Sequence, residues 1–166
     1  MPARKNDPAK VTLPSDREIL ITRTFDAPRR FIFEALSKCE HVKHWWGPRG
    51  FVITDCQLDF RPGGKWRYVV RKPDGAEEAF RGEIREIVPN ERVVQTFEYE
   101  PMPGFVSVET LTLVEQNGKT IYTVRSLFNS VEERDGMLQS GMEGGMNETL
   151  DRLEEYLPEL QGAAVH

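Results

Sequence analysis

The sequence predicts an α+β domain in which a curved antiparallel sheet of six or seven strands packs on one long C-terminal helix, with two short helices after the first strand. Three observations lead to this prediction. Residues 131–157 carry an apolar stripe at helical spacing. Six segments between residues 51 and 128 alternate apolar and polar side chains. Short turn signals separate these segments, and strands joined by short turns pair in antiparallel fashion.

The long helix is expected at 131–157. Its apolar residues follow one another at spacings of four or three, which places them on one face: Leu138, Met142, Met146, Leu150, Leu153 and Leu157. Ser130 is the expected N-cap, and Glu133 completes a capping-box pattern. Pro158 predicts that the helix stops at Leu157.

Four glycines interrupt the first half of this helix, at 136, 141, 144 and 145. One interpretation is a close approach to the sheet or a kink. The other is that these glycines and the nearby methionines form a soft, flexible wall that faces a cavity. The two interpretations are compatible.

The first strand and the two short helices precede the main run of strands. Residues 18–25 alternate like a strand. Asp26 is the expected cap of the following helix, with Pro28 in its first turn. Residues 40–46 form the second short helix, which Gly47 and the proline after it end.

The remaining strands are expected at 51–60, 65–72, 79–88, 92–100, 106–115 and 119–128. The sequences RPGG, PDG, PN, PMPG and QNG lie between them in that order. Glycine, proline, asparagine and aspartate are the residues that tight turns prefer. One domain over residues 17–158 therefore accounts for the chain, with flexible tails at 1–16 and 159–166.

Charge and composition limit the function classes. The net charge is −5 and no basic block occurs, so a nucleic-acid surface has no electrostatic support. No apolar run is long enough to predict a membrane span, and the N-terminus lacks the apolar core of a secretory signal. These features predict a cytoplasmic protein with reduced thiols at Cys39 and Cys56, although the spacing also allows a disulfide between them.

Several motifs resemble one family when they are taken with the order of elements. They are FDAP (25–28), WWGP (45–48), LDFRPGG (58–64), WRY (66–68), GEI (82–84), GMEGG (141–145) and LDRL (150–153). Together they resemble the START-like or SRPBCC superfamily, which has the birch-pollen-allergen fold. Within it they are similar to the AHSA branch, the homologues of an activator of the heat-shock-chaperone ATPase. The resemblance covers residues 18–157 and implies a helix-grip fold.

The resemblance also implies a cavity between the concave face of the sheet and the long helix. We expect a mostly apolar lining with a few polar groups, as small-molecule sites usually have. The candidate lining residues are Trp66, Tyr68, Glu109, Leu111, Leu113, Tyr122, Val124, Met142 and Met146. The alternative is that these side chains fill the space as an ordinary core.

Few residues suggest catalysis or metal binding. Glu109 shares the alternation of Leu111, so it points into the cavity if that face is inward, and Tyr122 is the only partner that a catalytic pair could use. Arg125 could pair with Glu109 only if its strand had the opposite parity. His41 and the histidine three residues later lack a third ligand, so a solvated helix face is expected, with no metal and no cofactor.

Three functions are therefore considered. The first is non-catalytic binding of an apolar or aromatic small molecule, such as a lipid or polyketide. The second is a protein-interaction module with a chaperone partner, as the resemblance implies. The third is a cyclase or hydrolase that uses Glu109 and Tyr122. Edge strands and an exposed pair at Trp45 and Trp46 also suggest a weak homodimer.

Overall fold

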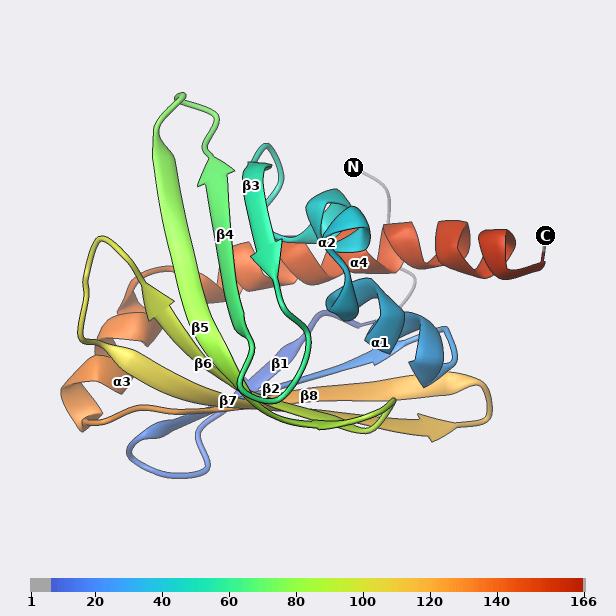
Figure 1. Cartoon of the computed structure of the whole chain (residues 1–166). Helices are drawn as coiled ribbons and strands as arrows, with labels where there is room; N and C mark the ends of the chain where they lie inside the picture. The colour runs from blue at the N-terminus through green and yellow to red at the C-terminus, as the bar shows by residue number, and fades with distance from the viewer. Residues whose placement is uncertain (1–6, 166) are drawn as a thin grey trace.

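Eight strands form one antiparallel sheet in the computed structural model, which describes residues 7–165 (Figure 1). Their order across the sheet is β1-β2-β8-β7-β6-β5-β4-β3. The strands are β1 (Lys10–Thr12), β2 (Glu18–Phe25), β3 (Val52–Leu58), β4 (Lys65–Arg71), β5 (Glu77–Val88), β6 (Arg92–Tyr99), β7 (Val106–Gln116) and β8 (Lys119–Leu127). The predicted fold class is confirmed, with one strand more than the upper expectation.

Four helices accompany the sheet: α1 (Arg29–Ser37), α2 (Cys39–Trp45), α3 (Val131–Gln139) and α4 (Met142–Val165). Figure 1 shows the sheet bending strongly, so that β3, β4 and β5 stand almost upright while β2, β7 and β8 run across the view. Helix α4 runs along the concave side, and α1 and α2 pack against it. No helix in the described part of the chain has the length and apolar character needed to cross a membrane.

The sheet curves where its ladders are irregular. The pairing of β5 with β6 shifts register between Ile84 and Glu86, and that of β3 with β4 shifts between Ile53 and Asp55. Bulges of this kind bend a strand and increase its twist. The bends let the sheet wrap around α4, and they produce the concave face on which the cavity lies.

The expected single helix at 131–157 is wrong in two ways. It breaks at Ser140 and Gly141, because Gly141 has a φ of 81°, which a helix cannot continue. It also runs past Pro158 to Val165. Leu157 and Leu160 are both buried in the core, and burial of a leucine contributes about 1.5–3 kcal/mol. That burial offsets the cost of a proline inside a helix, which is about 3 kcal/mol.

The N-terminal residues also differ from the expected tail. Strand β1 pairs with β2, and the amide of Ala9 donates a hydrogen bond to Asn147 Oδ1 of α4 at 2.9 Å. The expected tail therefore contributes an edge strand to the sheet, while residues 1–6 lie outside the described residues.

The N-termini of α3 and α1 show which of the two predicted N-caps is correct. Ser130 does cap α3, where its side chain accepts a hydrogen bond from the amide of Glu133. Asp26 does not cap α1, because the N-cap is Pro28 and no side chain caps that helix.

The two cysteines form a disulfide, so the expectation of reduced thiols is wrong. Cys39 begins α2 and Cys56 lies in β3, which α2 contacts. Their Cα atoms are 5.9 Å apart, a separation typical of disulfides. Disulfides persist mainly in oxidising compartments. The bond therefore removes one argument for a cytoplasmic location, which stays a prediction.

The expectation of an exposed tryptophan pair is wrong. Trp45 is only 4% exposed, and its indole nitrogen donates a hydrogen bond to the carbonyl of Ala35 at 3.0 Å. Trp46 packs against the rings of Tyr68 and Phe80. The prediction of a weak homodimer therefore loses one of its two arguments. It now rests on the edge strands of the sheet alone and stays a prediction.

Candidate functional site

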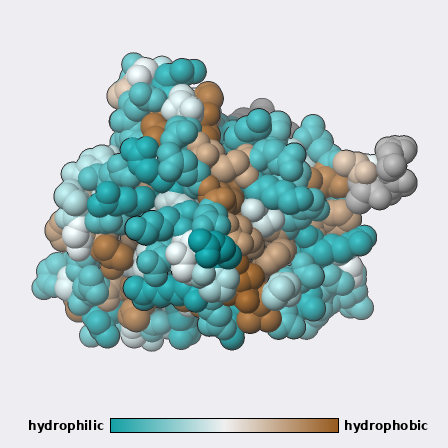
Figure 2. All heavy atoms as spheres, viewed as in Figure 1, coloured by the Kyte–Doolittle hydropathy of each residue, from teal (hydrophilic) through white to brown (hydrophobic). Residues whose placement is uncertain are grey.

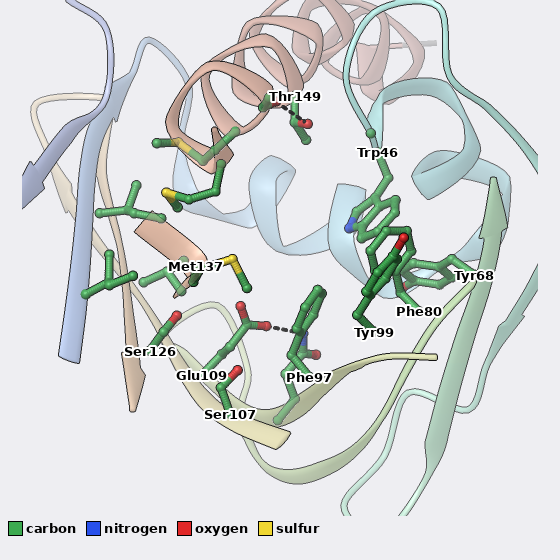
Figure 3. Close-up of a pocket in the computed structure, with 18 of the residues that line it drawn as sticks. Trp46, Tyr68, Phe80, Phe97, Tyr99, Ser107, Glu109, Ser126, Met137 and Thr149 are labelled. Atoms are coloured by element: carbon green, nitrogen blue, oxygen red, sulfur yellow. Dashed lines mark hydrogen bonds between the residues drawn. The ribbon is translucent and has the colours of Figure 1, made fainter. Parts of the chain in front are cut away.

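A cavity of about 930 Å³ lies between the concave face of the sheet and the helices (Figure 3). Strands β2 to β8 supply its floor and one wall, α3 and α4 supply the other wall, and α1 and α2 contribute Leu36, Val42 and Trp45. Met102 and Phe105, in the loop between β6 and β7, also line it and are 54% and 53% exposed. Exposed lining residues indicate that the cavity opens between this loop and the start of α3. On the face shown in Figure 2, apolar residues form a band with hydrophilic residues on both sides.

One wall of the cavity is aromatic. Its rings come from neighbouring strands and from the segment after α2: Trp46, Trp66, Tyr68, Phe80, Phe97 and Tyr99. Ring centroids lie 4.9 Å apart for Trp66 and Tyr68, and 5.1 Å apart for Trp46 and Tyr68. These distances are typical of favourable aromatic pairs. The rings therefore support one another and leave their remaining faces to the cavity (Figure 3).

The segment that carries Trp46 is tied to α4. Arg152 Nη1 donates hydrogen bonds to the carbonyls of Gly47 and Pro48, at 2.8 Å and 3.3 Å. Its Nη2 donates to the carbonyl of His44 at 3.2 Å. One guanidinium thus fixes the chain on both sides of Trp46, which holds this ring in the aromatic wall.

The opposite wall contains methionine. Met137 comes from α3, and Met142 and Met146 come from α4. Methionine is flexible and polarisable, so it adapts to ligands of different shape. The glycines fit both interpretations of the sequence: Gly141 makes the break between the helices, and Gly136 lines the cavity with open space beside it, while the flexibility of this wall stays a prediction.

Polar side chains gather on the floor, where they form a row across three strands. Gln95 of β6 lies opposite Glu109 of β7, which lies opposite Ser126 of β8. Ser107 is two residues before Glu109 on the same face and is buried. Gln95 Nε2 donates a hydrogen bond to Glu109 Oε1 at 3.3 Å. Figure 3 shows the carboxyl group pointing into the cavity between Met137 and Phe97.

Burial shifts the pKa values of the groups around the cavity. Desolvation raises the pKa of Glu109, and the hydrogen bond from Gln95 opposes this only in part. Burial also raises the pKa of Tyr122, with a smaller contribution from the nearby charge of Glu109. Desolvation and the hydrogen bond that Tyr99 donates to Glu78, 2.7 Å long, raise the pKa of Tyr99 to about 12. The neutral forms of these groups are therefore favoured.

Eight of the nine candidate residues from the sequence line this cavity: Trp66, Tyr68, Glu109, Leu111, Tyr122, Val124, Met142 and Met146. Leu113, the ninth candidate, does not line the cavity and is buried in the apolar core. Arg125 is not the partner of Glu109, because it lies on the other face and pairs with Glu18 at 3.5 Å.

The sequence did not nominate part of the aromatic wall or most of the floor. Phe97, Tyr99 and Gln95 alternate along β6 and share one face, and this alternation was the signal that could have found them. Ser126 shares the face of Tyr122 and Val124 in the same way.

The two histidines pack on α4 instead of forming a metal site. His41 Nδ1 is 2.7 Å from the hydroxyl of Tyr156, and the ring of His44 stacks on that of Tyr156 at 4.8 Å. Within residues 7–165, no group of three or more His, Cys, Asp or Glu side chains has an arrangement that could hold a metal ion.

Residues 26–158 match the family described as Activator of Hsp90 ATPase homolog 1-like protein. The chain belongs to this family. The match spans both short helices, strands β3 to β8 and most of α4. This match confirms the family resemblance that the sequence motifs indicated for this AHSA1-like chain. No protein in a search of curated proteins matches the chain.

Solved structures of bacterial proteins share this AHSA1-like fold. A crystal structure from Rhodobacter sphaeroides has a TM-score of 0.86 at 24% identity, and the alignment covers 92% of this chain and 99% of that one. A crystal structure from Mycobacterium smegmatis has a TM-score of 0.81 at 25% identity, covering 90% and 97%. A solution structure from Staphylococcus epidermidis has a TM-score of 0.74 at 27% identity, covering 89% and 93%.

Proposed function

We propose that this AHSA1-like protein binds an apolar or aromatic small molecule in the cavity between the sheet and α4, and that it does not catalyse a reaction on it. The observation that carries the proposal is the cavity itself. Its volume of about 930 Å³ is within the range of small-molecule sites, roughly 300–1,000 Å³. Aromatic rings and methionines form its walls, and a few polar groups form its floor. A core that filled the same space would leave no such volume.

Binding without catalysis is favoured by the chemistry of the floor. A hydrolase or cyclase that used Glu109 and Tyr122 would need one of them as a base near neutral pH. Burial raises the pKa of Tyr122, which makes it a poorer base than an ordinary tyrosine. The hydrogen bond that Glu109 accepts comes from Gln95 and not from Tyr122, so the two groups do not form a catalytic pair. A chaperone partner remains a prediction that the family description alone suggests, and a pull-down with the chaperone is its test.

Titration with the uncharged fluorescent probe N-phenyl-1-naphthylamine tests the binding proposal. Gly136→Leu adds a side chain where the cavity is open, and Met137→Trp enlarges one that points into it. We expect both variants to bind the probe at least about tenfold more weakly, because each fills space that the probe needs. Gly144→Leu is the matched control, since a side chain there also meets open space but does not line the cavity.

Three results would contradict the proposal. They are no probe binding to the wild-type protein, equal affinity in all four proteins, and the same loss of affinity in the Gly144→Leu control. Melting curves of each variant show whether it is folded. Native mass spectrometry of freshly purified protein would then give the mass of any ligand retained from the cell.

A further inference from the structure

The cavity is acidic, although its walls are apolar. Four glutamates line it: Glu78, Glu109, Glu132 and Glu133. None of the described residues that line it is a lysine, an arginine or a histidine. Sites for fatty acids and other anions require a donor or a cation for the acid group. The lining of this cavity lacks the cation, since Lys72 pairs with Glu78 at 3.1 Å but does not line the cavity. Any charged carboxylate of the lining repels a negative ligand.

Glu109 is the acid that a bound ligand would reach at the floor. The groups that face it from the packed elements are neutral: Gln95 from β6, Ser126 from β8, Met137 from α3, and Phe97 beside it. The charge of a buried carboxylate is costly unless a positive group or several hydrogen bonds compensate it. Gln95 supplies one long hydrogen bond, at 3.3 Å to Oε1. The floor therefore offers a carboxylate to a positive group that the protein does not itself provide there.

The aromatic wall suits the same kind of ligand. A cation is attracted to the face of an aromatic ring, most strongly to tryptophan and tyrosine. Phe97 lies next to Glu109, and the rings of Tyr68, Phe80 and Trp46 continue the wall beyond it (Figure 3). A group held at Glu109 would thus have a carboxylate on one side and aromatic faces on another, while the methionines contact the rest of the ligand.

We propose that the ligand is a cationic amphiphile, an apolar or aromatic body that carries a protonated amine, with the ammonium group at Glu109. This inference rests on the proposed function, because it assigns a chemical class to the ligand of the same cavity. Pairing with the ammonium group stabilises the charged form of Glu109, which burial alone disfavours. Fatty acids and other carboxylates are excluded as the preferred ligands.

Three ligands with one chain and different head groups test the inference: decylamine, decanol and decanoate. At pH 7 the amine is positive, the alcohol is neutral and the carboxylate is negative. Their dissociation constants are measured by displacement of N-phenyl-1-naphthylamine from the wild-type protein. We expect decylamine to bind at least about tenfold more tightly than decanol, since a hydrogen bond to a charged group contributes that much. Decanoate is expected to bind most weakly.

Two variants then test whether Glu109 causes the preference for the amine. Glu109→Gln keeps the shape of the side chain and removes its charge, so the ratio of amine to alcohol affinity should fall about tenfold. Glu143→Gln removes an exposed carboxylate of α4 that does not line the cavity, and we expect it to keep the wild-type ratio. Melting curves check that both variants fold.

The outcomes separate the inference from the proposed function. If the probe does not bind, the proposed function fails and the inference fails with it. If the probe binds and the wild-type protein prefers decanol or decanoate to decylamine, only the inference is overturned. An amine preference that Glu109→Gln leaves intact overturns the assignment to Glu109.

Discussion

The indole nitrogen of Trp66 donates a hydrogen bond to the backbone carbonyl of Thr96, 3.2 Å away on the second strand over. The indole crosses Gly82, its partner on β5. A Cβ atom at Gly82 would lie 1.9 Å from the Thr96 oxygen and 2.4 Å from the indole nitrogen. The absence of a side chain at this position therefore lets the Trp66 indole reach across β5 to β6, which fixes this ring in the aromatic wall of the cavity.

Gly82→Ala should therefore destabilise the protein by about 3 kcal/mol or more. The methyl group clashes with the Thr96 carbonyl of β6 and displaces the Trp66 indole, which breaks a buried hydrogen bond, and both effects are costly. Urea denaturation measures the loss. Gly144→Ala is the matched control, because it adds the same methyl group in open space within a helix, where alanine is favoured by about 1 kcal/mol. Equal stability of the two variants would contradict the close crossing.

A second prediction concerns Arg23, whose side chain is fully buried between β2 and α4. Its Nη1 is 2.8 Å from Asp151, and its Nη2 is 3.3 Å from Glu154. Arg23→Met should cost about 3–5 kcal/mol, since removing one partner leaves largely buried carboxylates without this cation. Thermal melting measures the effect.

Arg125→Met provides the comparison for Arg23. Arg125 lies on the neighbouring strand, is 53% exposed and pairs with Glu18 at 3.5 Å. Exposed ion pairs contribute little, about 1 kcal/mol or less. A similar fall in melting temperature for both variants would show that Arg23 does not anchor α4.

Sequence patterns predicted the fold well where a local rule acted alone. Alternation located the strands, and the capping box at Ser130 was correct. The errors arose where distant contacts decided the outcome. Pro158 is a stop signal by itself, but burial of Leu160 carries the helix past it. The candidate site follows the same rule. Alternation along β7 identified Glu109, whereas the identity of its hydrogen-bond partner, Gln95, is set by the register between β6 and β7.

A third prediction concerns the bond between Cys39 and Cys56, which closes a loop with a sequence separation of 17. A disulfide around a loop of this length contributes about 3 kcal/mol by restricting the unfolded chain. Cys39→Ala and Cys56→Ala should therefore lower stability by similar amounts under oxidising conditions. Added reductant should destabilise the wild-type protein and leave the two variants unchanged. Reaction of the untreated, folded protein with a thiol reagent would contradict the bond.

The last prediction concerns the pH dependence that Glu109 gives to folding. Desolvation raises its pKa in the folded protein above the ordinary value of 4.5. The folded state thus holds this proton more tightly than the unfolded state does. The resulting stability is fully present below about pH 4.5 and is lost as the pH rises through the folded-state pKa. Glu109→Gln has no proton to lose at this position, so it does not undergo that loss.

The free energy of unfolding of Glu109→Gln, measured relative to the wild-type protein, should therefore increase as the pH rises above about 4.5. Urea denaturation between pH 4 and pH 8 measures this difference. Glu143→Gln controls for the change in net charge, because it removes an exposed carboxylate away from the cavity. A difference that stays constant with pH, or that falls as the pH rises, would mean that the carboxyl group of Glu109 is solvated or paired in the folded protein. Saturating decylamine should reduce the difference at high pH, since the ammonium group stabilises the charged carboxylate that burial disfavours.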